Sequence, residues 1–166
     1  MRKASRPARD APPSGDAYDA AVRYLGPRPR SIAEIRRHLR TKRFDDPAQD
    51  KAIDALRAQG YIDDEAFARY WVDQRARFRP KGDRALVSEL MTKGVARETI
   101  DVILGEADPD AELKRARRVI GRSLARWLTL DEPQRKRKIH QHLAARGFSY
   151  DVIEDVMARP ESEDAE

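Results

Sequence analysis

The chain has 166 residues, a net charge of +5 and 38% charged residues, whereas about 25% is typical of a soluble domain. It contains no cysteine, which excludes disulfides and thiolate chemistry. No apolar run approaches about 18 residues and the N-terminus carries no apolar signal segment, so we expect a cytoplasmic protein without membrane contact.

Both ends of the chain are expected to lie outside the folded part. Residues 1–15 contain three prolines and four cations without periodic apolar residues, which predicts a disordered basic arm. Residues 160–166 begin with a proline and continue as ESEDAE, which predicts an acidic tail. Between these ends apolar residues recur at helical spacing, and no hairpin signal separates alternating runs. We therefore predict an all-α fold.

Nine helices are predicted in chain order, in three groups of three. Their expected bounds are 16–25, 31–42 and 47–59, then 63–78, 82–93 and 97–104, then 110–128, 132–146 and 149–158. Ser31 and Glu34 have the spacing of a capping box, and Ile62 and Phe67 have the spacing of a hydrophobic staple.

An aromatic stripe lies on one face of the predicted helix 63–78. Its members are Phe67, Tyr70, Trp71 and Phe78. Such a stripe could serve as a platform for stacked bases, but core packing is the more common role of aromatic residues at helical spacing. We therefore assign these side chains to the core.

A helix–glycine–helix corner is repeated along the chain. Two copies match position for position: Leu90, Gly94, Val95, Ile100 and Ile103 against Leu143, Gly147, Phe148, Ile153 and Val156. A weaker copy has Arg43 in place of the glycine: Leu39, Arg43, Phe44, Ile53 and Leu56. Each glycine falls where a helix C-terminus favours a residue with positive φ. We expect Gly94 and Gly147 to adopt that conformation.

The repeat defines the expected organisation. Three three-helix repeats are predicted at 16–62, 63–109 and 110–159. Tandem units of this size contact mainly their neighbours, which predicts an elongated, curved array. Such an array presents a long surface, so we expect a monomer that binds an extended partner.

The positive charge is concentrated in the third repeat, where residues 112–147 carry a net charge of +8. On the predicted first helix of that repeat, four arginines fall within an arc of about 80°, opposite the apolar residues. Four further cations follow in the first turn of the next helix, where positive charge opposes the helix dipole. Four cations in a row at positions that the helix dipole disfavours suggest that these residues have a function. The candidate binding residues are Arg115, Arg118, Arg122, Arg126, Arg135, Lys136, Arg137 and Lys138.

No catalytic, metal or cofactor site is predicted. His140 and His142 are two residues apart, so on a helix their side chains point about 200° apart and cannot share one ion. The acidic pairs at 45–46 and 63–64 stand at predicted helix starts, where capping explains them. Phosphate loops, serine elbows and zinc spacings are absent. We do not expect an enzyme.

A helix-turn-helix DNA reader is an alternative, since three-helix units with a tight turn are typical of that class. The third helix of each repeat is poorly suited to a groove lined by phosphates. The segment DVIEDVM at 151–157 carries three acidic residues and no cation. Specific duplex reading is therefore disfavoured, and weak, non-specific DNA binding through the basic block is the alternative that stays open.

The segment QGYIDDEAFARYWVDQR at 59–75, a basic linker and LVSELMTKGVARETID at 86–101 together resemble the RecX family, regulators of the RecA recombinase. The matching pieces are Gly60 to Asp64, Phe67-Ala68, Glu89-Leu90 and Lys93 to Val95. The resemblance implies a small non-enzymatic protein of DNA repair, homologous recombination and the SOS response. Such a protein binds RecA and the RecA–DNA filament and usually damps ATP hydrolysis and strand exchange. No catalytic motif is implied.

Overall fold

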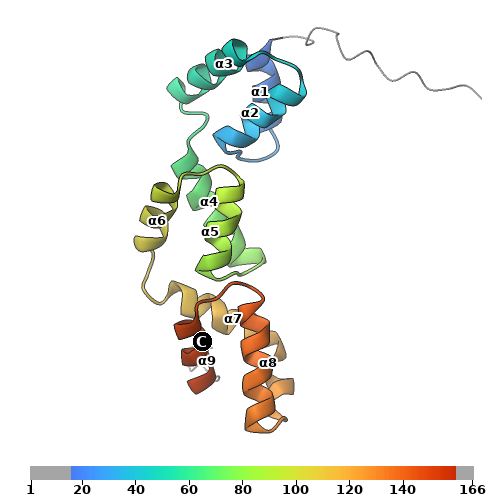
Figure 1. Cartoon of the computed structure of the whole chain (residues 1–166), viewed down its shortest axis with the longest axis vertical. Coiled ribbons are helices and arrows are strands. Elements are labelled where there is room, and N and C mark those ends of the chain that lie inside the picture. The colour runs from blue at the N-terminus through green and yellow to red at the C-terminus, as the bar shows by residue number, and fades with distance from the viewer. Residues whose placement is uncertain (1–15, 160–166) are drawn as a thin grey trace, which may run out of the picture. The chain divides into compact units, whose positions relative to one another are not determined.

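The structure is a computed structural model that describes residues 16–159. The predicted basic arm at 1–15 and the predicted acidic tail at 160–166 lie outside these residues. Across 16–159 the regular secondary structure consists of nine α-helices (Figure 1). Each helix begins and ends within two residues of its predicted bounds, which confirms the all-α prediction. The chain divides into two compact units at the boundary between Asp63 and Asp64.

The first unit contains the first repeat, built from α1 (Ala17–Leu25), α2 (Ile32–Thr41) and α3 (Asp46–Ala58). The predicted capping box is present at the start of α2. The Glu34 backbone N–H donates to Ser31 Oγ, and the Ser31 N–H donates to Glu34 Oε2, both at 3.1 Å. These two bonds satisfy backbone amides in the first turn of the helix, which has no intrahelical acceptors for them.

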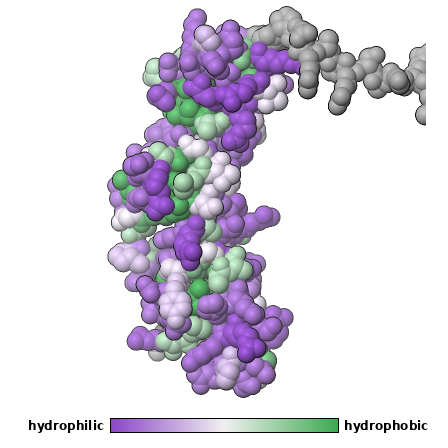
Figure 2. All heavy atoms as spheres, in the orientation of Figure 1, coloured by the Kyte–Doolittle hydropathy of each residue, from purple (hydrophilic) through white to green (hydrophobic). Residues whose placement is uncertain are grey.

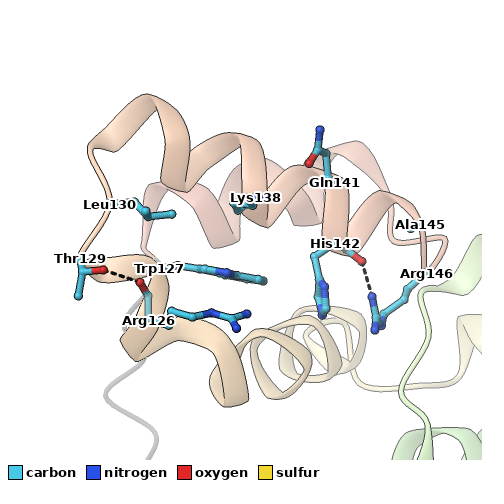
Figure 3. Close-up of a pocket in the computed structure, with 9 residues that line it drawn as sticks. All are labelled: Arg126, Trp127, Thr129, Leu130, Lys138, Gln141, His142, Ala145 and Arg146. Carbon is cyan, nitrogen blue, oxygen red and sulfur yellow. Dashed lines mark hydrogen bonds between the residues drawn. The ribbon is translucent and has the colours of Figure 1, made fainter.

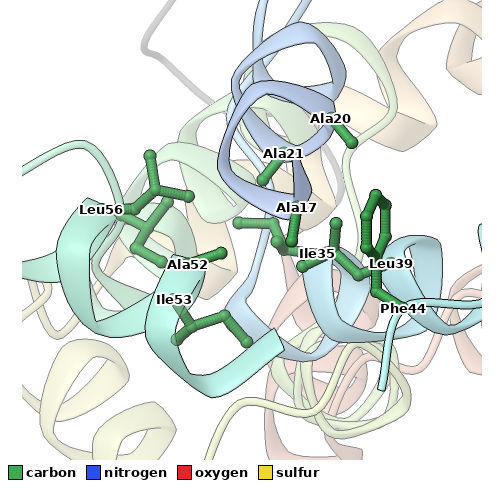
Figure 4. Close-up of a cluster of buried hydrophobic side chains, with 10 residues drawn as sticks. Ala17, Ala20, Ala21, Ile35, Leu39, Phe44, Ala52, Ile53 and Leu56 are labelled. Carbon is green, nitrogen blue, oxygen red and sulfur yellow. The ribbon is translucent and has the colours of Figure 1, made fainter. Parts of the chain in front are cut away.

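Small residues of α1 let the other two helices of the first unit approach closely. Ala17 and Ala21 of α1 pack with aliphatic side chains of α2 and α3 (Figure 4). Ile35 and Leu39 of α2 are fully buried in this cluster, and Phe44 covers it from the following turn.

The second unit contains the other two repeats. The second repeat comprises α4 (Asp64–Phe78), α5 (Asp83–Thr92) and α6 (Arg97–Gly105). The third comprises α7 (Ala111–Leu128), α8 (Glu132–Ala144) and α9 (Tyr150–Ala158). Each has its own apolar cluster, centred on Leu90 and Ile100 in the second repeat and on Ile120 and Leu143 in the third. Hydrophilic residues cover most of the face seen in Figure 2.

The aromatic stripe of α4 is only partly in the core. Phe67 is buried, and Trp71 packs against the same cluster with its ring centroid 6.0 Å from that of Phe67. Phe78 is 73% exposed, so its assignment to the core is wrong. Because Phe78 is the last residue of α4, the helix ends before the stripe reaches another covering element.

Glu89 organises the packing of α4 against α5. Its carboxylate accepts hydrogen bonds from Trp71 Nε1 at 2.9 Å, Arg75 Nε at 2.7 Å and Lys81 Nζ at 2.5 Å. Burial by itself would raise the pKa of Glu89, but these three donors together hold the pKa below its ordinary value. Lys93 Nζ lies 4.1 Å from the centroid of the Trp71 ring. Glu89 and Lys93 therefore stabilise the second repeat.

The repeated corners have the geometry predicted for them. Gly94 has φ 83° and Gly147 has φ 76°, which confirms the prediction. Val95 N–H donates to Leu90 O at 3.1 Å, and Phe148 N–H donates to Leu143 O at 3.3 Å. These bonds span six residues and close a Schellman cap. The weaker copy at Arg43 follows the same path, with φ 68° and a Phe44-to-Leu39 bond of 3.2 Å.

Close backbone contact joins the second and third repeats. Gly82 N–H donates to Arg146 O at 3.1 Å. A Cβ placed on Gly82 would lie 2.2 Å from Phe148 Cα, so only glycine fits. Glu112 of α7 accepts hydrogen bonds from the Asp83 N–H at 3.0 Å and from Ser149 Oγ at 3.1 Å. One carboxylate thus binds the N-terminal ends of α5 and α9.

Candidate functional site

The eight predicted binding residues lie on α7 and in the first two turns of α8. The four α7 residues do not share one environment. The end of α7 nearest the second repeat is covered by that repeat, whereas the rest of the arginine face is open. The eight residues therefore divide into one buried arginine and seven cations that are exposed or partly exposed.

Arg115 is not on an open surface. It is 8% exposed, its Nε donates to Lys81 O at 3.0 Å, and its guanidinium forms an ion pair with Asp83. The prediction that it projects freely from the helix is wrong, because the second repeat packs over the N-terminal half of α7. Burial raises the pKa of Asp83 above its ordinary value, although the Arg115 guanidinium opposes the rise. Arg115 stabilises the junction between the repeats.

Arg118 and Arg122 lie on the walls of a cleft between the C-terminal end of α4, α7 and α8. Both side chains are exposed, and Arg118 Nη1 donates to Ala76 O at 3.1 Å across the cleft. The cleft has a volume of about 660 Å³. Its lining consists of Arg77, Phe78, Arg79, Pro80, Lys81, Arg118, Val119, Arg122, Ser123, His142, Ala145 and Arg146. Six of these residues are cations, and none is acidic.

The predicted site omitted the cations contributed by α4 and by the end of α8. Arg77, Arg79 and Lys81 belong to the run RFRPK at 77–81, and Arg146 follows α8. The run is visible in the sequence as a basic linker. Its position against α7 is set by the junction of the second and third repeats, which the pattern of apolar residues does not reveal.

Arg126 and Lys138 lie at a second hollow, between the C-terminal half of α7 and α8 (Figure 3). Trp127 and His142 form its apolar wall, with ring centroids 5.2 Å apart in an edge-to-face arrangement. Burial, and secondarily the positive charge of Arg146, hold the pKa of His142 below its ordinary value. The histidine is therefore neutral at neutral pH, and the positive charge here comes from the arginines and the lysine.

The cations at the start of α8 remain open to solvent or partly so. Lys136 Nζ forms an ion pair with Glu132 Oε1 at 2.6 Å, and this hydrogen bond lowers the pKa of Glu132. Asp131 accepts the Gln134 N–H at 2.8 Å and so caps the helix. These two acids offset part of the unfavourable dipole interaction that the sequence indicated. Three cations of these two turns, Arg135, Arg137 and Lys138, have no ion-pair partner within residues 16–159.

The third helices have the acidic character expected from their sequences. In α9 the side chains of Asp151, Glu154 and Asp155 are all exposed. In α6 Asp101 is paired with Arg97 at 2.8 Å, which leaves Glu98 exposed. An acidic surface on these helices repels a phosphate backbone. The basic surface of the second unit instead lies along α7, the start of α8 and the end of α4.

The described part of the chain, residues 16–159, contains no cluster of three or more His, Asp or Glu side chains able to hold a metal ion. None of its helices has the length and apolar character needed to cross a bilayer.

Comparison with known proteins finds the three-helix units in one family. Models of the first, second and third three-helix domains of RecX match residues 17–61, 63–104 and 110–157. The chain belongs to the RecX family. Three domain models of this family in tandem account for almost all of the described chain.

Full-length RecX proteins are similar over most of their length. The chain is 36% identical over 159 residues to the regulatory protein RecX of Mycobacterium sp. (strain KMS), covering 92% of this chain and 87% of that protein. It is 34% identical over 141 residues to the regulatory protein RecX of Chlorobium phaeobacteroides (strain BS1), covering 85% and 91%.

Solved RecX structures share the fold. The crystal structure of RecX from Lactobacillus salivarius aligns with a TM-score of 0.77 at 22% identity, covering 86% of this chain and 92% of that one. A second crystal structure of a regulatory protein RecX aligns with a TM-score of 0.75 at 26% identity, covering 86% and 72%. These matches confirm the all-α fold built from three-helix repeats.

Proposed function

We propose that this RecX-family protein regulates the RecA recombinase by binding RecA and the RecA–DNA filament, and that it damps ATP hydrolysis and strand exchange. The observation that carries the proposal is the tandem match of all three RecX three-helix domains. Relatives similar over most of the chain are named regulatory proteins. The activity is non-enzymatic in this proposal, and it takes place in the cytoplasm, with the protein acting as a monomer.

The contact surface in this proposal is the open part of the basic surface. Seven of the eight cations predicted from the sequence belong to it: Arg118, Arg122, Arg126, Arg135, Arg137, Lys136 and Lys138. Arg115 is excluded because it is buried in an ion pair. Cations in exposed positions lose little hydration until a polyanion or an acidic protein surface approaches, so they suit a reversible complex with a charged filament.

The test is the ATPase activity of RecA on single-stranded DNA with this protein added at stoichiometric ratios. We expect ATP hydrolysis to fall, and we expect the triple variant Arg118→Ser, Arg122→Ser, Arg126→Ser to lose most of that effect. The matched control removes the same number of cations from the first unit, at Arg40, Lys51 and Arg57, which are all exposed. ATP hydrolysis that is unaffected by the unaltered protein contradicts the proposal.

Non-specific DNA binding unrelated to RecA is the second candidate function. The clustering of cations without acidic residues in the cleft of α4, α7 and α8 favours it. Under this alternative the protein binds bare DNA as tightly as it binds the filament. A comparison of the two affinities at one salt concentration separates the candidates, because affinity for DNA depends strongly on salt.

A further inference from the structure

The cleft between the end of α4, α7 and α8 combines an exposed aromatic ring with uncompensated positive charge. Phe78 is the last residue of α4 and stands between Arg77 and Arg79 in the chain. Its side chain is 73% exposed at the cleft although it belongs to a stripe whose other end is buried. A ring in this position has a free face on which a planar group can stack.

The cations around Phe78 are not neutralised equally. Arg77 is paired with Asp73 at 2.9 Å and Lys81 is paired with Glu89 at 2.5 Å. The two carboxylates do not line the cleft, but they neutralise the charges of these two cations. Arg79 and Arg122 form no ion pair with any residue of the described chain.

Two more guanidinium groups at the cleft are held by neutral partners. Arg118 Nη1 donates to Ala76 O at 3.1 Å and Arg146 Nη1 donates to His142 O at 2.9 Å. Carbonyl oxygens orient these groups without removing their charge. Four arginines thus keep their positive charge around the ring, and the lining contains no carboxylate that would repel an anion.

We propose that this cleft is a binding site for single-stranded nucleic acid. A base stacks on Phe78, and the guanidinium groups of Arg79 and Arg122 contact the phosphates on either side, with Arg118 and Arg146 contributing to the positive field. Planar guanidinium groups bind phosphate oxygens through paired hydrogen bonds. Exposed aromatic rings with basic neighbours are the usual means of holding a single strand without sequence preference.

The exposed ring favours a single strand over the other polyanions that fit the charge. In a duplex the bases are already stacked and paired, so Phe78 has no free base to contact. An acidic peptide satisfies the arginines but offers no planar group to the ring. The site rests on the second candidate function, DNA binding at this cleft. Its test uses bare strands without RecA, so its failure is distinguishable from a failure of the proposed regulation of RecA.

The experiment measures binding of a fluorescently labelled 12-nucleotide oligothymidine to the full chain by anisotropy at low salt. An abasic strand of the same length measures the charge contribution alone. We expect Phe78→Leu to weaken binding of oligothymidine by roughly 5- to 100-fold and to leave binding of the abasic strand and of a duplex unchanged. Phe78→Trp should retain affinity for oligothymidine and show quenched tryptophan fluorescence when the strand binds.

The charge contribution is tested with Arg79→Ser, Arg122→Ser. The salt dependence is the slope of the logarithm of the oligothymidine binding constant against the logarithm of the salt concentration. The double variant should reduce the magnitude of this slope by about 1.4, at about 0.7 for each lost phosphate contact. The matched control Lys51→Ser, Arg57→Ser removes the same charge from exposed positions of α3 and should leave the salt dependence unchanged. Circular dichroism should be the same for all variants, because every substituted side chain is exposed.

Three results overturn the site. Equal losses in the cleft variant and the α3 variant show that binding follows net charge alone. An unchanged affinity of Phe78→Leu for oligothymidine excludes stacking. Binding of a 12-residue polyglutamate with the same affinity and the same sensitivity to Arg79→Ser, Arg122→Ser assigns the cleft to an acidic peptide instead.

Discussion

The guanidinium of Arg115 in α7 forms an ion pair with the carboxylate of Asp83 in α5, and this contact joins the second and third repeats. Arg115 is almost fully buried, whereas the Asp83 side chain is 37% exposed. Removing Arg115 and removing Asp83 should therefore have different effects on stability. Without the arginine, a partly buried carboxylate has no counterion. Without the carboxylate, the guanidinium keeps its hydrogen bond to Lys81 O.

We expect Arg115→Met to lower the free energy of unfolding by about 2 kcal/mol, less than the 3–5 kcal/mol typical of a fully buried pair because Asp83 is partly solvated. Asp83→Asn should cost less, since burial already raises the pKa of Asp83 and disfavours its charged form. The double variant should recover part of the loss caused by Arg115→Met. Urea unfolding of the three variants measures these differences, and equal losses in both single variants contradict the asymmetry.

The two corner glycines should differ in their tolerance of alanine. Gly94→Ala should cost about 1 kcal/mol, because its positive φ is unfavourable for other residues. Gly147→Ala should cost about 2 to 4 kcal/mol, because the added Cβ would also lie 2.5 Å from the Ala85 Cβ and 2.7 Å from the Ala85 nitrogen. Thermal or urea unfolding measures both.

Substitutions at Gly94 itself test the assignment of its conformation. Asparagine tolerates positive φ better than β-branched residues do, so Gly94→Asn should be milder than Gly94→Val. If valine and asparagine prove equally costly, positive φ is not what restricts this position.

The Glu89 network should make the second unit sensitive to acid. Since the folded protein holds the pKa of Glu89 below its ordinary 4.5, the ionised form stabilises the fold. That contribution is fully present above pH 4.5 and is lost as the pH falls through the lowered pKa. Glu89→Gln should therefore destabilise the protein at pH 6, and its difference from the unaltered protein should shrink below pH 4. A difference that is constant between pH 6 and pH 3 contradicts this role.

His142 should also make the free energy of unfolding depend on pH, but in a higher pH range than Glu89. Its pKa is lowered in the fold from the ordinary 6.5, by burial and by Arg146, so the unfolded chain takes up a proton first as the pH falls. Stability should then decrease as the pH falls below about 6.5. His142→Gln should reduce the change in melting temperature between pH 7.5 and pH 5.5. A pH dependence of the melting temperature that is the same in His142→Gln and in the unaltered protein contradicts this role.

The first two turns of α8 should combine a small stability cost with a binding role. Replacing Arg135 and Arg137 by glutamine removes two cations near the positive end of the helix dipole. The fold should gain a few tenths of a kcal/mol, mainly from Arg135, because the dipole interaction fades beyond the first turn. The same variant should weaken binding to the RecA–DNA filament. Unfolding and filament binding are measured on one preparation, and full binding in this variant removes these two turns from the proposed contact surface.

The local architecture could be predicted from the sequence because its signals are local. Helices follow from apolar periodicity, the α2 start follows from the Ser31–Glu34 capping box, and the corners follow from Gly94 and Gly147 at helix C-termini. These signals act within one turn or one repeat, so they do not depend on how repeats pack. The elongated, curved shape expected of the array stays a prediction.

The candidate site was determined by tertiary structure, because the packing of the third repeat on the second decides which cations are open. Helical periodicity placed Arg115 and Arg122 on one face, but only the contact with Asp83 shows that Arg115 is buried. Periodicity likewise assigned Phe78 to the core, whereas α4 ends at that residue and leaves it exposed beside Arg79. Burial depends on residues distant in sequence, and a single helix pattern does not contain that information.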